Sequence, residues 1–509
     1  MDMKSIAFDN TYARDLIGFY VPCQPEPAPD PKLVYFNHEL AAELGLEPGG
    51  DDPSALAATL ATIFSGNRLP EGATPLAQAY AGHQFGQFSP QLGDGRALLI
   101  GELIDRHGKR RDLAFKGSGK TPFSRRGDGK AAIGPMLREV LIGEAMHALG
   151  IPTTRALAVV TTGEQVYRDR PLAGATLTRI ADSHIRVGTF QFFATHGSLE
   201  QVTKLADYTI ARHAPELVGA EDRYLQFFQL VAERQAALVA QWIHVGFIHG
   251  VMNTDNMSLA GETIDYGPCA FMEAYEPGAV FSSIDDFGRY AYDQQAKIAR
   301  WNLARLAETL LPLIAADQPR AIELATEVID AFPARHRHHW LEGARAKLGL
   351  AGQVDDGERI DTALAEDWLA LLQASKVDFT LAWRRLADTA GGNEGPLRAL
   401  FGEHQALDDW LVRWRARCAA EDAQAEASTS HDHAEARAKR MRCVNPWLIP
   451  RNHRVEEALD AASEAGDLKP FEQLLEALRL PYEERPAMSR FAEPATASFN
   501  QTFRTFCGT

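Results

Sequence analysis

Two acidic residues and an asparagine on neighbouring loops constrain the fold of this chain more than any other feature. Asp255 and Asn256 end the run His249-Gly-Val-Met-Asn-Thr-Asp-Asn256, and Asp265 follows after a short turn. Carboxylate and amide oxygens suit hard cations such as Mg²⁺, which bind through few protein ligands and the phosphates of a nucleotide. A further carboxylate could accept a hydroxyl proton. Taken alone, however, such a pattern is more often an ordinary Asn- and Asp-rich turn.

Residues that could bind phosphate precede these loops. Gly93 and Gly95 flank one aspartate just before a predicted strand, where glycine lets the backbone approach a ligand closely. Lys116 ends the next predicted strand, and Glu139 lies on the following predicted helix, where its carboxylate could orient the lysine toward phosphate. The Lys-Gly-Ser-Gly-Lys run that begins at Lys116 is not a P-loop, because Ala114 stands where that motif needs glycine.

The order of these groups predicts the fold. A glycine loop, a strand lysine, a helix glutamate, a histidine loop with an asparagine and an Asp-x-Gly triplet follow one another as in protein kinases. The chain departs from that layout at Val251, which stands two residues after His249, where kinases carry their catalytic aspartate. We therefore expect an α+β, protein-kinase-like two-lobed fold, with a small mixed lobe and a larger helical lobe, that lacks the base for ordinary phosphoryl transfer.

Hydrophobic periodicity divides the chain into two lobes with extensions. Five segments are expected: an N-terminal extension (1–75), the small lobe (76–185), the helical lobe (186–418), a linker or solvated helix (419–442) and a C-terminal helical extension with a cysteine tail (443–509). The first segment looks irregular, and the fourth is rich in Ala, Glu and His. In the small lobe two predicted hairpins surround one helix: 97–104 with 112–115, 156–160 with 165–167, and the helix near 135–149.

The composition excludes several classes of protein. The chain has 509 residues and a formal net charge of −16, so it has no general attraction for nucleic acid. Neither a signal peptide nor an apolar run long enough to span a membrane is visible. The five cysteines are odd in number and widely spaced, which favours a reducing compartment over a disulfide framework. We expect a cytoplasmic monomer that binds neither nucleic acid nor membranes.

The residues of these motifs resemble those of the selenoprotein O family of pseudokinases. The resemblance lies in six strings: Gly82-His-Gln-Phe-Gly86, Gln91-Leu-Gly-Asp-Gly-Arg96, Lys116-Gly-Ser-Gly-Lys-Thr-Pro-Phe-Ser-Arg125, Gly127-Asp-Gly129, His249-Gly-Val-Met-Asn-Thr-Asp-Asn256 and Ile264-Asp-Tyr-Gly267. Joined motifs of this length are far more specific than a lone Gly-x-Gly. The resemblance implies that AMP passes from ATP to Ser, Thr or Tyr hydroxyls of target proteins, with ATP bound in reverse of the kinase orientation.

The resemblance also implies a role for each candidate residue. Asp255 would be the general base, and Asn256 and Asp265 would hold Mg²⁺, for which Mn²⁺ is an alternative. Glu139 would form the structural ion pair with the strand lysine. The nucleotide would be held by the following residues: Gly93, Gly95, Arg96, Lys116, Asp128, Gly129, Arg179, Arg186 and Asp265. Several cations beside the β- and γ-phosphates would stabilise the pyrophosphate leaving group.

Two cysteines suggest redox control. The family carries a selenocysteine or cysteine near the C-terminus, and Cys507 stands at that place. Cys269 follows Asp265 by four residues, in the segment that corresponds to a kinase activation loop. We hypothesise that these cysteines form a regulatory disulfide, although two unpaired thiols fit the sequence nearly as well.

Two other functions stay compatible with the sequence. The same residues could transfer UMP from UTP, with Mn²⁺ as the metal. A nucleotide-binding scaffold without catalysis would explain why Val251 replaces the kinase aspartate. The joint presence of Asp255, Asn256 and Asp265 argues against a scaffold, which needs neither metal ligands nor a base.

Overall fold

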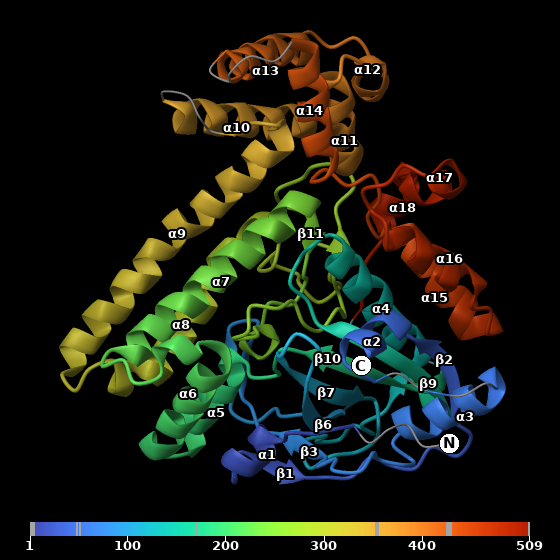
Figure 1. Ribbon diagram of the computed structural model, residues 1–509, viewed down its shortest axis with the longest axis vertical. Coiled ribbons are helices and arrows are strands. Elements are labelled where there is room, and N and C mark those ends of the chain that lie inside the picture. Colours follow the sequence, from blue (N-terminus) through green and yellow to red (C-terminus); the bar gives the residue numbers. More distant parts are fainter. Residues whose placement is uncertain are drawn as a thin grey trace.

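The computed structural model describes residues 6–46, 49, 52–168, 170–351, 356–423 and 430–506. It contains one lobe built on an antiparallel sheet and a larger helical region, which confirms the predicted α+β class and its two lobes. Figure 1 shows the sheet lobe at the bottom, long helices along the left side and a group of shorter helices at the top. Within the described residues, no helix has the length and apolar surface needed to cross a membrane.

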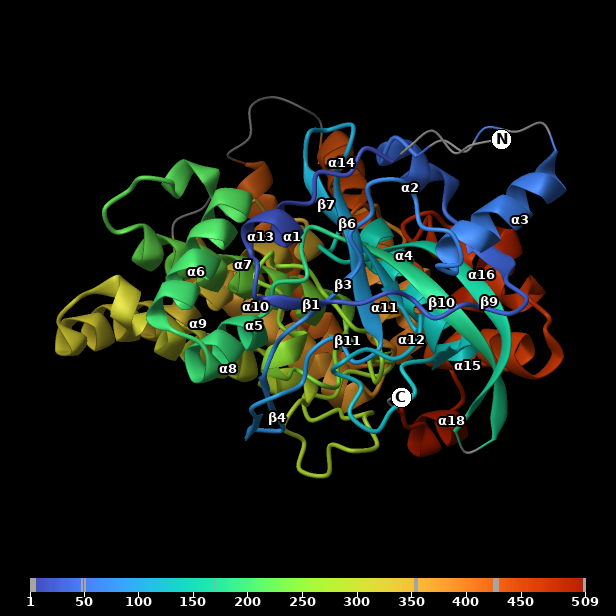
Figure 2. The same cartoon turned by 90° about the horizontal axis from the view of Figure 1, so that it is seen from below.

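An eight-stranded sheet forms the small lobe. Its strands run in the order β1 (Tyr20–Pro22), β3 (Leu76–Gln78), β6 (Ala97–Ile104), β7 (Arg110–Lys116), β10 (Pro171–Ala181), β9 (Arg155–Tyr167) and β2 (Lys32–Phe36), and β8 (Ala131–Ala132) pairs with β10. Figure 2 shows β6, β7, β10 and β9 side by side. Lys116 stands opposite Ala97 on one side and Leu177 on the other, so pairing on both sides fixes its place.

The second predicted hairpin was wrong, because residues 155–167 form one long strand. Thr161 pairs with Ala175 and Gln165 pairs with Ala173, so pairing with β10 continues where a turn was expected. Gly163 has a φ of 82° and lies where the register shifts, which makes it part of a bulge and not of a turn. Strand β10 itself was not predicted, since its many small residues give no clear alternation.

Residues 6–75 are more regular than the sequence suggested. They contain the following elements: α1 (Thr11–Asp15), β1, β2, α2 (His38–Glu43) and α3 (Pro53–Phe64). Strands β1 and β2 form the two outer edges of the sheet. Short edge strands depend on pairing with a neighbour far along the chain, which no local pattern reveals. The expectation of an irregular segment was therefore wrong, while the division of the chain into domains stays a prediction.

Helix α4 (Ile133–Ala148) is enclosed on several sides. Strands β9 and β10 pack against it, and so do α15 (Asn452–Asp460) and α16 (Lys469–Leu478) from the end of the chain (Figure 1). Even its carboxylates Glu139 and Glu144 are buried, and each has a cation as partner. A buried carboxylate without such a partner would be costly. The packing therefore holds Glu139 in one position.

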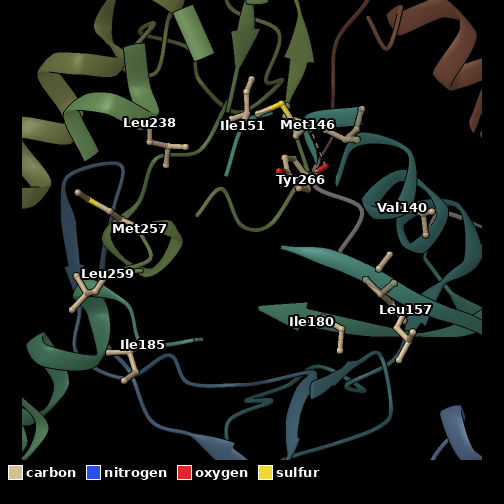
Figure 3. Close-up of a cluster of buried hydrophobic side chains, with 14 of the residues drawn as sticks. Val140, Met146, Ile151, Leu157, Ile180, Ile185, Leu238, Met257, Leu259 and Tyr266 are labelled. Atoms are coloured by element: carbon tan, nitrogen blue, oxygen red, sulfur yellow. Dashed lines mark hydrogen bonds between the residues drawn. The ribbon is translucent and has the colours of Figure 1, made fainter. Parts of the chain in front are cut away.

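One hydrophobic core continues from the sheet lobe into the helical lobe. Figure 3 shows part of it, with side chains from both lobes: Val140, Met146, Leu157, Ile180, Leu238, Met257 and Leu259. Tyr266 lies among them, 1% exposed, and its hydroxyl shares a hydrogen bond with Thr153. Because Tyr266 directly follows Asp265, the core anchors the loop that carries this candidate site residue.

Long helices form the body of the helical lobe. Helices α7 (Arg223–Val245), α8 (Gln295–Ile314) and α9 (Gln318–Leu348) pack on one another, beside the shorter α5 (Val187–His196) and α6 (Leu199–His213). The end of α9 joins a second hydrophobic cluster at the top of Figure 1. That cluster is formed with five further helices: α10 (Gly357–Ser375), α11 (Phe379–Ala390), α12 (Gly395–Phe401), α13 (Gln405–Asp422) and α14 (Ser430–Arg442).

Residues 430–442 belong to the segment 419–442 that was expected to be a linker or a solvated helix, and they are helical. They make up α14, which packs against α11. Its Ala438 and Met441 are both fully buried. Small alanines allow close helix packing, so the scarcity of large apolar residues in this segment was misleading.

Lys347, near the end of α9, gives a prediction for stability. Its side chain is buried, with Nζ 4.8 Å from the ring centre of Trp383, and burial lowers its pKa to about 7. An unfolded lysine has a pKa of about 10.4. Between these values the unfolded chain binds one more proton than the folded chain, so stability should rise with pH. We expect Lys347→Met to be more stable than the unchanged protein at pH 7, with a gap that narrows by pH 10.

Thermal unfolding of both proteins at pH 7 and pH 10 measures this gap. Lys297→Met, at an exposed position of α8, is the matched control and should show no such pH dependence. A gap of equal size at both pH values would contradict the prediction.

Candidate active site

A cavity of about 640 Å³ lies between the two lobes. Nine of the candidate residues line it: Gly95, Arg96, Lys116, Glu139, Arg179, Arg186, Asp255, Asn256 and Asp265. They come from the sheet, from α4 and from the loops after α7, so the fold brings together segments far apart in the sequence. A larger hollow of about 980 Å³ elsewhere on the molecule contains none of the candidate residues.

Three cations converge on Asp265. Lys116 Nζ donates a hydrogen bond to Asp265 Oδ1 at 2.7 Å, and Arg179 Nη1 donates to the same oxygen at 2.7 Å. Arg186 Nη2 lies 3.7 Å from Asp265 Oδ2. Burial alone would raise the pKa of Asp265, but these cations hold it well below its usual range. Lys116 Nζ also donates to Glu139 Oε1 at 2.8 Å, so the lysine bridges two carboxylates.

The register of the sheet places two of these cations on one face. Arg179 on β10 stands opposite Ala114, two residues before Lys116 on β7. Side chains two residues apart share a face of a sheet, so Lys116 and Arg179 both point into the cavity. Arg179 is 2% exposed and Arg186 is 2% exposed, which rules out their interpretation as surface arginines.

The backbone at Asp265 is strained. Its φ is 65°, in the left-handed region that costs a residue with a side chain roughly 1–2 kcal/mol. The main chain is held there by its neighbours: Tyr266 N donates to Glu139 Oε1 at 3.1 Å, and Arg138 Nε donates to the carbonyl of Gly267 at 2.9 Å. Strain of this kind is found at functional sites and aims the side chain into the cavity.

Asp255, a half-buried residue, also lines the cavity. It lies on a short 3₁₀ turn (Thr254–Asn256), and its Oδ1 is buried without a hydrogen-bond partner. Burial raises the pKa of Asp255 to about 6. A Cβ on Gly82 would lie 2.5 Å from Asp255 Oδ1, so only glycine leaves room for the carboxylate here. An unpaired buried carboxylate oxygen is rare in proteins and marks a place where a ligand group is expected.

Asn256 and Asp265 present oxygen atoms that fit a divalent cation. Asn256 Nδ2 donates to the carbonyl of Val251 at 3.0 Å, which orients the amide. The Asp265 side chain is 23% exposed toward the cavity. Among the described residues, no group of three His, Cys, Asp or Glu side chains could hold a metal by itself. An ion here would therefore need the phosphates of a nucleotide as further ligands, as Mg²⁺ commonly does.

Three of the candidate nucleotide-binding residues lie apart from the cavity lining. The Asp128 carboxylate accepts hydrogen bonds from Arg168 at 2.9 and 3.1 Å, which lower its pKa. Gly93 has a φ of 78°, and a Cβ there would lie 2.3 Å from the Phe123 ring. Gly129 has a φ of 69°, and a Cβ there would lie 2.0 Å from the Gly119 carbonyl oxygen. Neither position therefore has room for a side chain. The nucleotide-binding roles of Gly93, Asp128 and Gly129 stay predictions.

Cys269, one member of the hypothesised cysteine pair, lies in the protein core. Cys269 is fully buried, with Sγ 3.5 Å from the carbonyl oxygen of Tyr266, and burial raises the pKa of its thiol to about 11. Cys507 lies outside the described residues. Thr505, two residues earlier, donates from its hydroxyl to the carbonyl of Pro268 at 2.7 Å, directly before Cys269. The end of the described chain therefore reaches the neighbourhood of Cys269, while the disulfide stays a prediction.

Sequence reasoning missed two buried residues that hold Arg179. Arg179 Nε donates to His184 Nε2 at 3.2 Å, and His184 Nδ1 lies 2.8 Å from Asp112 Oδ2. Burial lowers the pKa of His184, so the ring is neutral, donates to Asp112 and accepts from Arg179. Arg212 in turn pairs with Asp112. Asp112 stands four residues before Lys116, but no sequence pattern pairs it with His184 or Arg212, so no local signal could have indicated this network.

Two further missed residues contact Arg186. Its guanidinium lies 4.4 Å from the ring centre of Tyr80, and its Nη1 lies 3.5 Å from Asp94 Oδ1. Asp94 also accepts a hydrogen bond from the backbone of Gln78 at 3.0 Å. The signal for Asp94 was present, because it stands between the two glycines of the first motif. Tyr80 lies outside the motifs, so no sequence pattern indicated its contact with Arg186.

The fold is that of a protein-kinase-like enzyme in which Val251 stands where kinases carry their catalytic aspartate. The family described as protein adenylyltransferase SelO matches residues 2–479. The chain therefore belongs to the SelO family, and it is a nucleotidyltransferase.

Relatives that resemble the chain over nearly its whole length are named protein nucleotidyltransferase YdiU. One from Chromobacterium violaceum is 60% identical over 491 residues, which cover 96% of this chain and 99% of that protein. One from Cereibacter sphaeroides is 60% identical over 505 residues, 99% of each chain. One from Rhizobium etli is 56% identical over 507 residues, 99% of this chain and 98% of that protein.

The His184 contact gives a prediction for nucleotide binding. His184→Leu removes the acceptor for Arg179 Nε and leaves that donor buried and unpaired. A hydrogen bond to a charged group is worth about 1.5–3 kcal/mol, so the KM for the nucleotide should rise about tenfold or more. His184→Gln, whose amide oxygen can accept the same bond, should recover part of the loss.

Steady-state kinetics with the nucleotide varied measures this effect. The control is His244→Leu, which removes another buried histidine, one that bonds to the Trp340 carbonyl and lies outside the cavity lining. Equal KM values for His184→Leu and the unchanged protein would show that His184 does not hold Arg179 for the nucleotide.

Proposed function

We propose that this enzyme transfers AMP from ATP to Ser, Thr or Tyr hydroxyls of target proteins, with ATP reversed relative to protein kinases. The observation that carries this proposal is the charge of the most buried part of the cavity. Arg179, Arg186 and Lys116 are all buried there, beside Asp265. Such surroundings suit phosphate groups and do not suit the flat, apolar adenine ring. The β- and γ-phosphates would lie among these cations, and the α-phosphate nearer the opening.

Asp255 is the residue proposed to accept the proton of the acceptor. It lies on the same loop as Val251, which occupies the position of the kinase base and has no proton acceptor in its side chain. Asp255 lines the same cavity as the three cations, and one of its carboxylate oxygens has no hydrogen-bond partner in the described part of the chain. Gly82 and the 3₁₀ turn hold the carboxylate in place. The α-phosphorus would be attacked inside the cavity that Asp255 and these cations line together.

The reaction then runs in one displacement. The hydroxyl oxygen of the acceptor attacks the α-phosphorus of ATP, and its proton passes to Asp255. The bond between the α-phosphorus and the oxygen leading to the β-phosphate breaks, and pyrophosphate leaves. Lys116, Arg179 and Arg186 bind the departing pyrophosphate and stabilise its charge. A divalent cation, Mg²⁺ or Mn²⁺, held by Asn256 and Asp265 would neutralise phosphate charge when bound.

This function can be tested with two samples of ATP, one labelled at the α-phosphate and the other at the γ-phosphate. Transfer of label from α-labelled ATP, and none from γ-labelled ATP, onto protein is the expected result. Label from the γ-phosphate alone would mean a kinase. The same assay with α-labelled UTP, in Mg²⁺ and in Mn²⁺, decides whether UMP transfer is the preferred reaction.

The role of Asp255 predicts a large loss on substitution. Asp255→Asn keeps the size of the side chain but removes the proton acceptor, and general-base catalysis contributes about 100-fold or more. We expect kcat to fall by that factor while nucleotide binding, measured by calorimetry, stays within about threefold. Asp330→Asn, an ion-paired surface position on α9, is the control. An Asp255→Asn enzyme with unchanged kcat would remove Asp255 from the mechanism.

A further inference from the structure

The described end of the chain is seated at the opening of the cavity as a short β-bridge. Thr505 N donates to the carbonyl of Phe281 at 2.8 Å, and Ser283 N donates to the carbonyl of Thr505 at 2.9 Å. The pairing is parallel, and Thr505 is 4% exposed. These main-chain bonds do not depend on which side chain the added segment carries. Residues 281–283 therefore form a strand edge that can bind extended chain, and Thr505 occupies it here.

Large apolar side chains stand exposed around this bridge. Ile284 is 52% exposed, Phe506 is 72% exposed and Phe287 is 98% exposed. Ile284 and Phe506 line the same cavity as Asp255. Among the described residues, no large apolar side chain is more exposed than Phe287. Exposed apolar groups collected at one place are typical of a surface that binds a protein partner.

The loop that carries these side chains is fixed to the catalytic loop. Asp285 is buried and accepts hydrogen bonds from the backbone of Arg289 at 2.9 Å and of Tyr290 at 2.8 Å. The Tyr290 hydroxyl donates to Asn253 Oδ1 at 2.7 Å, two residues before Asp255. A segment bound to residues 281–287 would therefore be held at a defined position relative to Asp255.

We propose that residues 281–287 form the docking surface for the acceptor protein, which binds as an extended segment. Its backbone would pair with residues 281–283 where Thr505 now pairs. Apolar residues beside the modified hydroxyl would pack on Ile284 and Phe287. This inference rests on the proposed function, and it adds the class of acceptor: an unfolded or loop segment with apolar neighbours, in competition with residues 503–506 of the enzyme itself.

Binding of a peptide tests the surface without catalysis. The probe is a fluorescein-labelled peptide with the sequence of residues 499–506, Phe-Asn-Gln-Thr-Phe-Arg-Thr-Phe. The full chain with Thr505→Pro, which loses both the N–H and the hydroxyl that seat the tail, should bind it more tightly than the unchanged chain. Adding Phe287→Ser should weaken that binding about fivefold or more. Phe287 is almost wholly exposed, so the substitution leaves folding intact.

Matched controls separate the surface from a general apolar effect. Val412→Ser, at a 65% exposed position on α13, should not change binding of the peptide. Equal binding with and without Phe287→Ser would overturn the inference. So would a Phe287→Ser chain that elutes as a monomer where the unchanged chain elutes as a dimer, because the surface would then serve a second copy.

Transfer to an acceptor distinguishes this inference from the proposed function. With unfolded casein and α-labelled ATP, Phe287→Ser and Ile284→Ser should raise the KM for casein and leave the KM for ATP unchanged. The peptide should inhibit competitively against casein and not against ATP. Absence of any α-label transfer by the unchanged enzyme would defeat the proposed function. Normal transfer with an unchanged KM for casein in both variants would defeat only the docking surface.

Discussion

The contacts of Asp265 join the two lobes of this enzyme. Lys116 and Arg179 belong to the sheet, whereas Asp265 sits on a loop anchored by Tyr266 in the core shared with the helical lobe. Loss of the Asp265 carboxylate would leave Lys116 and Arg179 with Glu139 as their shared buried carboxylate, and loss of either cation would leave a poorly compensated buried charge. The geometry of the cavity and the attachment of the lobes thus depend on the same few atoms.

The charges of this cluster balance one another, while Arg186 Nε is buried without a hydrogen-bond partner among the described residues. The acidic groups Glu139, Asp265 and Asp94 balance Lys116, Arg179 and Arg186. Phosphates that enter must take over part of the hydrogen bonds now made to Asp265. A divalent cation that binds Asp265 at the same time would compensate for that exchange. Binding of nucleotide and metal would therefore be linked: phosphates would take hydrogen bonds from Asp265, and the metal would replace them at that carboxylate.

Much of the site could be predicted because several of its residues lie close together in the sequence, within single motifs. Asp255, Asn256 and Asp265 lie on loops whose residue order fixes their separation, and the order of motifs was enough to predict two lobes. The rest depends on contacts between distant segments. Strand β10 and the burial of Arg179 follow from sheet pairing, and His184 reaches Asp112 only after the chain has folded back on itself. Local patterns contain no record of such pairs.

The enclosure of α4 has a consequence for control of the enzyme. Kinases commonly switch by swinging the helix that bears the glutamate away from the lysine. Here a similar swing would pull α4 from the sheet and from α15 and α16 at once, and each exposed Å² of apolar surface would cost about 25 cal/mol. Such a swing would therefore be costly in this enzyme. Control of access to the cavity would regulate it without that cost.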